Sequence, residues 1–166
     1  LFYQNLLKPI NLKIKPYAII HCAAKHRFSK TGNDMRNIYT TNVKMTKNLI
    51  NFSNNNNVKK IIFLSSIDVY GVIKNKIVFE NQKPFSSDLY GKSKFISEKM
   101  FCKKSNKFKA ICIRLPGIFT FNLKKNHPLI IKILKQIMNN EDVSTYNLNN
   151  KFNNILDVKE IVKFIN

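Results

Sequence analysis

Short uninterrupted apolar runs, each bounded by small or polar residues, recur along this chain. The clearest of them lie at residues 17–24, 61–64 and 110–115. Runs of this length, without alternation of apolar and polar positions, are typical of strands that are buried on both faces of a parallel sheet. We therefore predict three buried β-strands.

The segments between these runs have the spacing of helices. Apolar residues form a broad stripe over residues 33–53, which predicts an amphipathic helix. A second helix is predicted from near Leu89, and a third over about residues 127–138, followed by a strand near residues 144–146. Strands that alternate with helices predict an α/β protein with a parallel sheet flanked by helices.

Polar side chains follow the second apolar run. Ser65 and Ser66 come directly after Leu64, and ligands of open α/β sheets bind at the carboxyl ends of the strands. Tyr90 and Lys94 are four residues apart, so they share one face of the predicted helix. A serine, a tyrosine and a lysine that converge at this edge form a plausible proton-transfer set.

The motifs around these residues resemble a known family. LSSIDVYG at residues 64–71, followed by YGKSK at residues 90–94, is similar to the extended short-chain dehydrogenase/reductases, which include nucleotide-sugar epimerases, dehydratases and reductases. Further matches are PYAIIHCAA at 16–24, TNVKMTKNLI at 41–50, RLPGIFT at 114–120 and FNNILD at 152–157. The resemblance covers most of the chain and implies a Rossmann-like sheet.

The resemblance implies roles for four catalytic residues. Ser66 would hold the substrate oxygen, Tyr90 would move its proton, and Lys94 would bond the ribose of the cofactor. Asn42 would bond the main chain and help to hold the active site and its water. A free tyrosine has a pKa of about 10, and lowering it by about three units requires roughly 4 kcal/mol. A lysine cation and an oxidised nicotinamide nearby favour such a change.

The cofactor implied by the resemblance is NAD or NADP. The residues expected to contact it are Cys22, Ala23, Ala24, Thr41, Ser65, Tyr90, Lys94, Pro116 and Ile118. The residues expected to contact the substrate are Ser66, Glu80 and Gly117. No metal site is expected, because the cysteines and histidines show no ligand spacing.

Two departures from the family pattern bear on the substrate and the reaction. Ile67 and Asp68 stand where the dehydratases carry Asp-Glu, and Ile67 cannot protonate a leaving hydroxyl. Dehydration is therefore the least favoured reaction. Gly117 and Thr120 replace the Asn and Gly of many sugar-nucleotide members, which leaves the identity of the sugar open.

The glycines are too few for the family's phosphate-binding turn, Gly-x-x-Gly-x-x-Gly. Only Gly32, Gly71, Gly91 and Gly117 occur, and the family places that turn in its first strand-helix unit. The chain also starts without an initiator Met or a signal peptide. We therefore expect a fragment that lacks the N-terminal strand-helix units and most of the small substrate domain, and that is inactive and binds NAD and NADP poorly when expressed alone.

This expectation divides the chain into three segments. Residues 1–120 would form a partial NAD(P)-binding Rossmann domain with the catalytic residues. Residues 121–153 would be a reduced substrate-binding region, and residues 154–166 would return to the cofactor domain. A homodimer could form through the helices at 33–53 and 89–103.

The charge is strongly basic, with 29 Lys plus Arg against 9 Asp plus Glu and a formal net charge of +20. Such a charge raises the alternative of a nucleic-acid or anionic membrane partner. The lysines form no block and no aromatic-basic platform is present, so we favour compositional drift and expect no dedicated partner of either kind. Three dispersed cysteines indicate a reducing cytoplasm, and no apolar run reaches membrane-spanning length.

The leading interpretation is an NAD(P)-dependent epimerase or keto-reductase. It would act on a nucleotide-linked sugar by hydride transfer with the Ser-Tyr-Lys relay. Three alternatives stay open: a short-chain reductase of another hydroxyl or ketone substrate, a non-catalytic basic binding protein that retains the fold, and a catalytically dead fragment. The residue that separates NAD from NADP lies upstream of this chain in the family.

Overall fold

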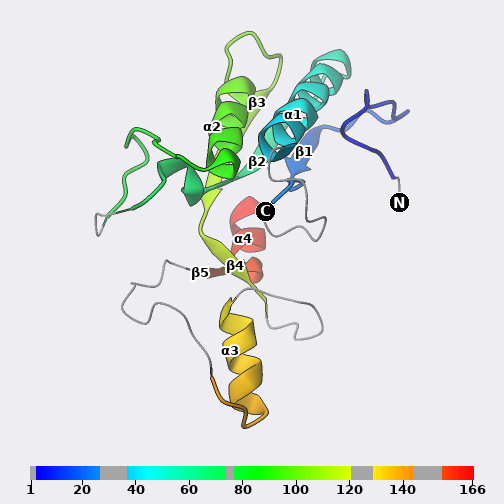
Figure 1. Ribbon diagram of the computed structural model, residues 1–166. Coiled ribbons are helices and arrows are strands. Elements are labelled where there is room, and N and C mark those ends of the chain that lie inside the picture. The colour runs from blue at the N-terminus through cyan, green and yellow to red at the C-terminus, as the bar shows by residue number, and fades with distance from the viewer. Residues whose placement is uncertain (1–2, 27–36, 74–76, 121–128, 144–154) are drawn as a thin grey trace. The chain divides into compact units, whose positions relative to one another are not determined.

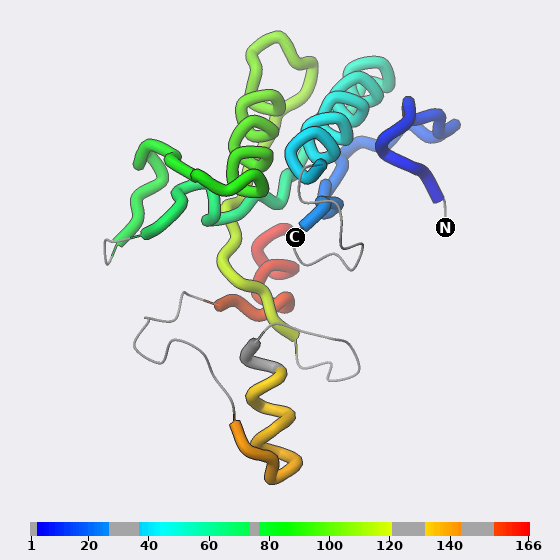
Figure 2. The backbone as a smooth tube through the Cα atoms, viewed as in Figure 1, coloured from blue at the N-terminus to red at the C-terminus, as the bar shows by residue number. Residues whose placement is uncertain are grey.

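The computed structural model describes residues 3–26, 37–73, 77–120, 129–143 and 155–166, and the side chains of 132–143 within the fourth range. The chain forms two compact units, Leu1–Arg114 and Leu115–Asn166 (Figures 1 and 2). Each unit is described by itself. The division of the chain into a cofactor part and a substrate part stays a prediction.

The first unit is built on a three-stranded sheet. Its strands, in the order β1-β2-β3, are β1 (Ala18–His21), β2 (Lys60–Ser66) and β3 (Lys109–Leu115). Strands β1 and β2 are parallel, with Ile19 beside Ile61 and His21 beside Phe63. The three strands lie at the three apolar runs, so their positions are confirmed. The expected burial on both faces is wrong for two of them, because Ile20 on β1 is 50% exposed and Ile111 on β3 is 53% exposed.

Two helices of the first unit lie side by side (Figure 1), α1 (Ile38–Asn55) and α2 (Leu89–Phe101). The hydrophobic core joins one side chain of each helix to strand β2, because Leu49 and Phe101 pack with Ile61 and Phe63 in one buried cluster. Helices α1 and α2 therefore cover the face of the sheet that carries Ile61 and Phe63. Helix α1 starts at Ile38, and the predicted residues 33–36 lie outside the described part of the chain.

Small polar side chains let α1 and α2 approach closely. Asn42 and Thr46 on α1 face Ser93 and Ser97 on α2, with 2.9 Å between Asn42 Nδ2 and Ser93 Oγ and 2.8 Å between Thr46 Oγ1 and Ser97 Oγ. All four residues are buried. Buried polar groups cost free energy unless they are hydrogen-bonded, so these pairs keep the interface polar without leaving groups unpaired.

The start of α2 is held against a short 3₁₀ helix, η2 (Ile67–Tyr70), which follows β2 directly. Asp88 caps α2 by accepting a hydrogen bond of 3.3 Å from the backbone N–H of Gly91. A Cβ at Gly91 would lie 2.3 Å from the backbone oxygen of Asp68, so only glycine permits this contact. The first turn of α2, which carries Tyr90, is thereby placed beside the carboxyl end of β2.

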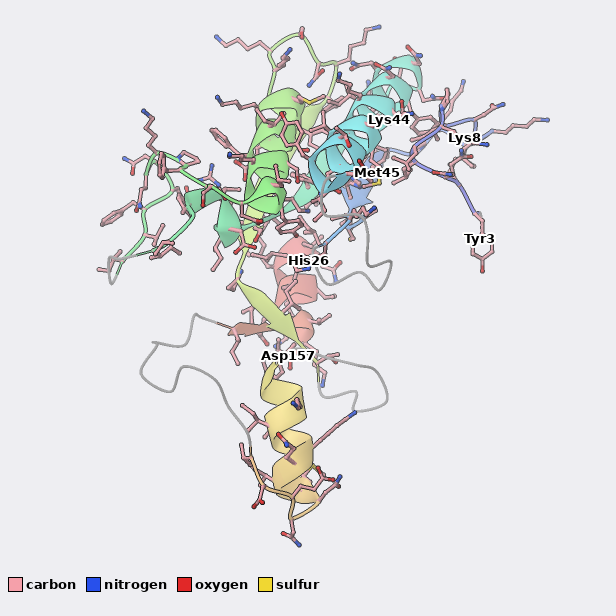
Figure 3. The ribbon with its side chains drawn as sticks, in the orientation of Figure 1. Tyr3, Lys8, His26, Lys44, Met45 and Asp157 are labelled. Carbon is pink, nitrogen blue, oxygen red and sulfur yellow. The ribbon has the colours of Figure 1, made fainter. Side chains whose placement is uncertain are left out.

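The described part of the second unit contains a parallel pair of short strands and two helices. The elements are β4 (Gly117–Phe119), α3 (Leu129–Met138), β5 (Ile155–Asp157) and α4 (Val158–Ile165). Asp157, labelled in Figure 3, caps α4 by accepting a hydrogen bond of 2.8 Å from the N–H of Lys159. The predicted third helix is confirmed from Leu129 onward, and the strand predicted near 144–146 lies outside the described residues.

Candidate active site

The carboxyl ends of β1 and β2 lie at one edge of the first sheet, since the two strands are parallel. Cys22, Ala23 and Ala24 follow β1 directly and are exposed. Their small side chains leave the backbone open to a ligand. Ser66 ends β2 at the same edge and is half-buried.

The two serines at the end of β2 bond in different directions. Ser65 is buried, and its hydroxyl donates a hydrogen bond of 2.6 Å to Glu98 Oε1. The Ser66 oxygen accepts a hydrogen bond of 3.1 Å from the N–H of Asp68, which leaves the Ser66 hydroxyl hydrogen to donate. The hydroxyl hydrogen of Ser65 is thus used by Glu98, and the contact expected between Ser65 and the cofactor stays a prediction.

Tyr90 and Lys94 lie on α2 above β2, and both are buried. The Lys94 ammonium donates a hydrogen bond of 2.7 Å to the backbone oxygen of Leu64 and lies 4.7 Å from the centroid of the Phe63 ring. The same ammonium lies 5.6 Å from the centroid of the Tyr90 ring. The structure therefore brings the tyrosine and the lysine together beside the strand that ends in Ser66.

Burial lowers the pKa of Lys94 to about 8, although the nearby Cys22 and Glu98 pull it upward. At pH 7 the side chain is still mainly an ammonium. Such a group has three N–H donors, and one of them is used by Leu64. The cation is thus held in place with donors left for a ligand.

Asn42 joins α1 to the segment that follows β1. Its Oδ1 accepts a hydrogen bond of 2.8 Å from the N–H of Lys25, and its Nδ2 donates one of 3.1 Å to the backbone oxygen of Lys25. Ser93, which Asn42 also contacts, donates to the backbone oxygen of Tyr90 at 2.7 Å. Asn42 therefore fixes the chain after Ala24 and the helix turn of Tyr90 at once. Its part in holding a water stays a prediction.

A charged network that lies next to these residues was not predicted from the sequence. The Arg114 guanidinium contacts Glu98 through Nη2 at 2.8 Å and through Nε at 3.0 Å. Its Nη1 bonds the Tyr70 hydroxyl and, at 3.0 Å, the backbone oxygen of Glu80. Glu98 lies one helical turn after Lys94, on the same face of α2. An acidic residue at that spacing was the feature of the sequence from which this network could have been predicted.

The remaining predicted contacts belong to several different segments of the chain. Thr41 is half-buried on α1, directly before Asn42, and Glu80 is exposed in the segment before α2. Pro116, Gly117 and Ile118 belong to the second unit and are considered only within it. Among the described residues, no cluster of three His, Cys, Asp or Glu side chains could hold a metal ion.

Two histidines lie close to the candidate residues. His26, labelled in Figure 3, meets the Tyr90 ring edge-on, with 4.6 Å between the ring centroids. His21 is buried and stacks on Phe63, with 5.5 Å between centroids. Burial, and then the charge of Lys94, lower the pKa of His21 to about 4.

The low pKa of His21 predicts a loss of stability in acid. Its value of about 4 in the folded state lies below the ordinary 6.5, so between these pH values the unfolded chain binds the extra proton. The free energy of unfolding therefore falls as the pH drops from 6.5 to 4, by up to roughly 3 kcal/mol. His21→Phe should remove this part of the fall in urea titrations across that range. Equal pH dependence in both proteins would contradict the assignment.

Comparison with models of known protein families assigns the chain to one of them. The model of the NAD dependent epimerase/dehydratase family matches residues 4–165. The chain belongs to this family. The family resemblance drawn from the sequence motifs is thereby confirmed, and so is the predicted Rossmann-like sheet flanked by helices.

Individual relatives in the family are epimerases by name. The chain is 32% identical over 122 residues to N-acetyl-alpha-D-glucosaminyl-diphospho-ditrans,octacis-undecaprenol 4-epimerase of Escherichia coli O157:H7, covering 72% of this chain and 35% of that protein. It is 26% identical, with a TM-score of 0.73, to UDP-N-acetylglucosamine 4-epimerase from Methanobrevibacter ruminantium M1 in complex with UDP-N-acetylmuramic acid, covering 88% of this chain and 49% of that one.

A more distant structure shows the fold alone. The enzyme WbmG of Bordetella bronchiseptica, in complex with NAD and UDP, is 17% identical with a TM-score of 0.73, over 90% of this chain and 45% of that chain. The chain thus spans about half the length of these solved structures, and about a third of the curated relative. In the part of the chain that the structure describes, no helix has the length and apolar character needed to cross a membrane.

Proposed function

We propose that this chain carries the proton-transfer residues of an NAD-dependent 4-epimerase of diphosphate-linked sugars. The observation that carries the proposal is the placement of Tyr90 and Lys94 on α2, with the Lys94 ammonium bonded to Leu64 two residues before Ser66. This placement supports a proton relay made of Ser66, Tyr90 and Lys94.

The likeness to two 4-epimerases supports the reaction and narrows the substrate. Both are named for an N-acetylglucosaminyl group, carried on an undecaprenyl diphosphate in one and on UDP in the other. We therefore propose an N-acetylhexosamine linked to a diphosphate as the substrate. The positive net charge of +20 would favour the approach of such an anion.

The residues at the sheet edge fit a nicotinamide cofactor. Cys22, Ala23 and Ala24 are exposed and small, so the backbone after β1 is open to close approach. The Lys94 ammonium uses one N–H for Leu64, and its other N–H groups would donate hydrogen bonds to the ribose hydroxyls. Bound NAD would supply the chemistry of reversible hydride transfer at the sugar carbon.

The side chains of the site would move and hold the proton. Tyr90 would take the proton from the sugar 4-hydroxyl and give it back after the sugar has turned its other face. The Ser66 oxygen already accepts a hydrogen bond from the N–H of Asp68. Its hydroxyl would therefore donate a hydrogen bond to the same sugar oxygen. The Lys94 cation would favour the anionic form of Tyr90, and Asn42 would keep the helix turn of Tyr90 in place.

The test is the interconversion of UDP-N-acetylglucosamine and its 4-epimer by the full-length protein. We expect product by nuclear magnetic resonance with no net consumption of NAD, because the hydride is returned within each turnover. A keto-reductase would instead consume reduced nicotinamide in proportion to product. The absence of both reactions, with NAD bound, would contradict the proposed function and favour a binding protein that retains the fold.

A further inference from the structure

Two of the three cysteines of the chain lie next to each other. Cys102 follows the last residue of α2 and is exposed, while Cys112 lies in β3 and is half-buried. Their Sγ atoms are 3.7 Å apart. Cys22 is also exposed, but it lies on the segment after β1, with no sulfur contact among the described residues.

The separation of the two sulfurs is short enough for a disulfide to form by a small movement. A disulfide needs a sulfur-sulfur distance of about 2.05 Å, so the two atoms must approach by less than the width of one atom. Cys102 is the C-cap of α2, and its side chain is exposed. Rotation of this side chain can therefore supply the movement while the helix end stays in place.

We propose that Cys102 and Cys112 form a dithiol site that hydrogen peroxide oxidises to an intramolecular disulfide. This site is separate from the proton-transfer residues and does not rest on the proposed epimerase reaction. Cys102 is the residue that meets the oxidant, because it is exposed. Cys112 is the residue that resolves the product, since its sulfur lies within contact distance of Cys102 and it is less exposed than Cys102.

The chemistry balances in two steps. The Cys102 thiolate attacks one peroxide oxygen, the O–O bond breaks, and Cys102 sulfenic acid and hydroxide form. The Cys112 sulfur then attacks the Cys102 sulfur, the S–O bond breaks, and the thiol proton leaves with the hydroxyl group as water. Two thiols lose two electrons and the peroxide is reduced to two waters. Burial, and then the neighbouring Cys102, raise the pKa of Cys112, so Cys112 is the poorer first nucleophile.

The disulfide would reinforce a connection that the fold already makes. Glu98 lies one helical turn before Cys102 on α2, and Arg114 lies two residues after Cys112 on β3. The bidentate contact between Glu98 and Arg114 thus joins the same two elements. A covalent link there restricts the unfolded chain more than the folded one, so oxidation should stabilise the protein.

The experiment is peptide mapping of the full-length protein after mild peroxide treatment, without reductant. We expect one linked peptide pair that contains Cys102 and Cys112 and that dithiothreitol separates. The oxidised protein should melt about 5 °C higher than the reduced one. Linkage of Cys22 to another chain as the main product, or oxidised Cys102 without the link, would overturn the proposal.

Three variants keep the test sharp. Cys22→Ser should leave both the linked peptide and the melting shift unchanged. Cys112→Ser should lose both, and its Cys102 should accumulate as sulfenic acid that reacts with dimedone. If Cys112→Ser does not fold, Cys102→Ser replaces it in the test, because Cys102 is exposed. Cys102→Ser should form no disulfide with Cys112. Retention of the melting shift in Cys102→Ser would overturn the proposal.

Discussion

In the full-length protein, Tyr90→Phe is expected to lower kcat for sugar epimerisation by roughly 100- to 10,000-fold, the usual contribution of a positioned acid-base group. The substitution keeps the ring, which is buried and contacts His26 and the Lys94 ammonium. It removes only the hydroxyl that would exchange a proton with the sugar oxygen. The affinity for NAD, measured by calorimetry, should therefore change little.

A matched control separates this loss from a general effect of the substitution. Tyr3, labelled in Figure 3, is 92% exposed, so Tyr3→Phe should leave both kcat and NAD affinity unchanged. Turnover near the wild-type rate in Tyr90→Phe, at saturating substrate and cofactor, would show that another group moves the proton.

The parts of the fold that rest on local pattern were predictable. Strand β2 is an uninterrupted apolar run followed by two serines, and the Tyr90–Lys94 spacing places both side chains on one face of α2 wherever that helix begins. The predicted stripe begins at residue 33, and α1 is described from Ile38, since residues 33–36 lie outside the described part of the chain. Helix ends depend on caps, and Asn37 makes no side-chain cap at this one.

The parts of the site that depend on distant partners could not be predicted. Glu98 and Arg114 are sixteen residues apart on a helix and a strand, and no spacing rule links such positions. The contact between Ser65 and Glu98 was not foreseen for the same reason, and the cofactor contact expected of Ser65 stays a prediction. Once α2 packs on the sheet, however, Glu98 faces both Ser65 and Arg114.

A second large effect is expected at Glu98. Its carboxylate is buried and bonds two side chains, the Arg114 guanidinium and the Ser65 hydroxyl. Glu98→Ala would leave the guanidinium, whose side chain is 24% exposed, without its counter-charge. Removal of one partner of a buried ion pair costs about 3–5 kcal/mol, and the partial exposure of Arg114 places the expected loss near the lower figure.

The loss should be measured as the free energy of unfolding in urea, on the full-length protein. The ion pair of Glu160 and Lys163 offers a matched control, because its 2.9 Å contact is similar but both side chains are largely exposed. Surface pairs of this kind contribute little, so Glu160→Ala should unfold at almost the wild-type urea concentration.

Glu98→Gln tells charge and shape apart. The amide keeps the volume of the side chain and its carbonyl oxygen can still accept from Ser65, so a purely steric role predicts near wild-type stability. Glu98 raises the pKa of the Arg114 guanidinium above its usual value, chiefly through its hydrogen bonds. The negative charge of Glu98 is therefore expected to contribute to stability. We therefore expect Glu98→Gln to lose about half of what Glu98→Ala loses, since hydrogen bonds to charged groups contribute roughly 1.5–3 kcal/mol. Stability equal to the wild type in both variants would show that the pair is a consequence of the fold and not one of its supports.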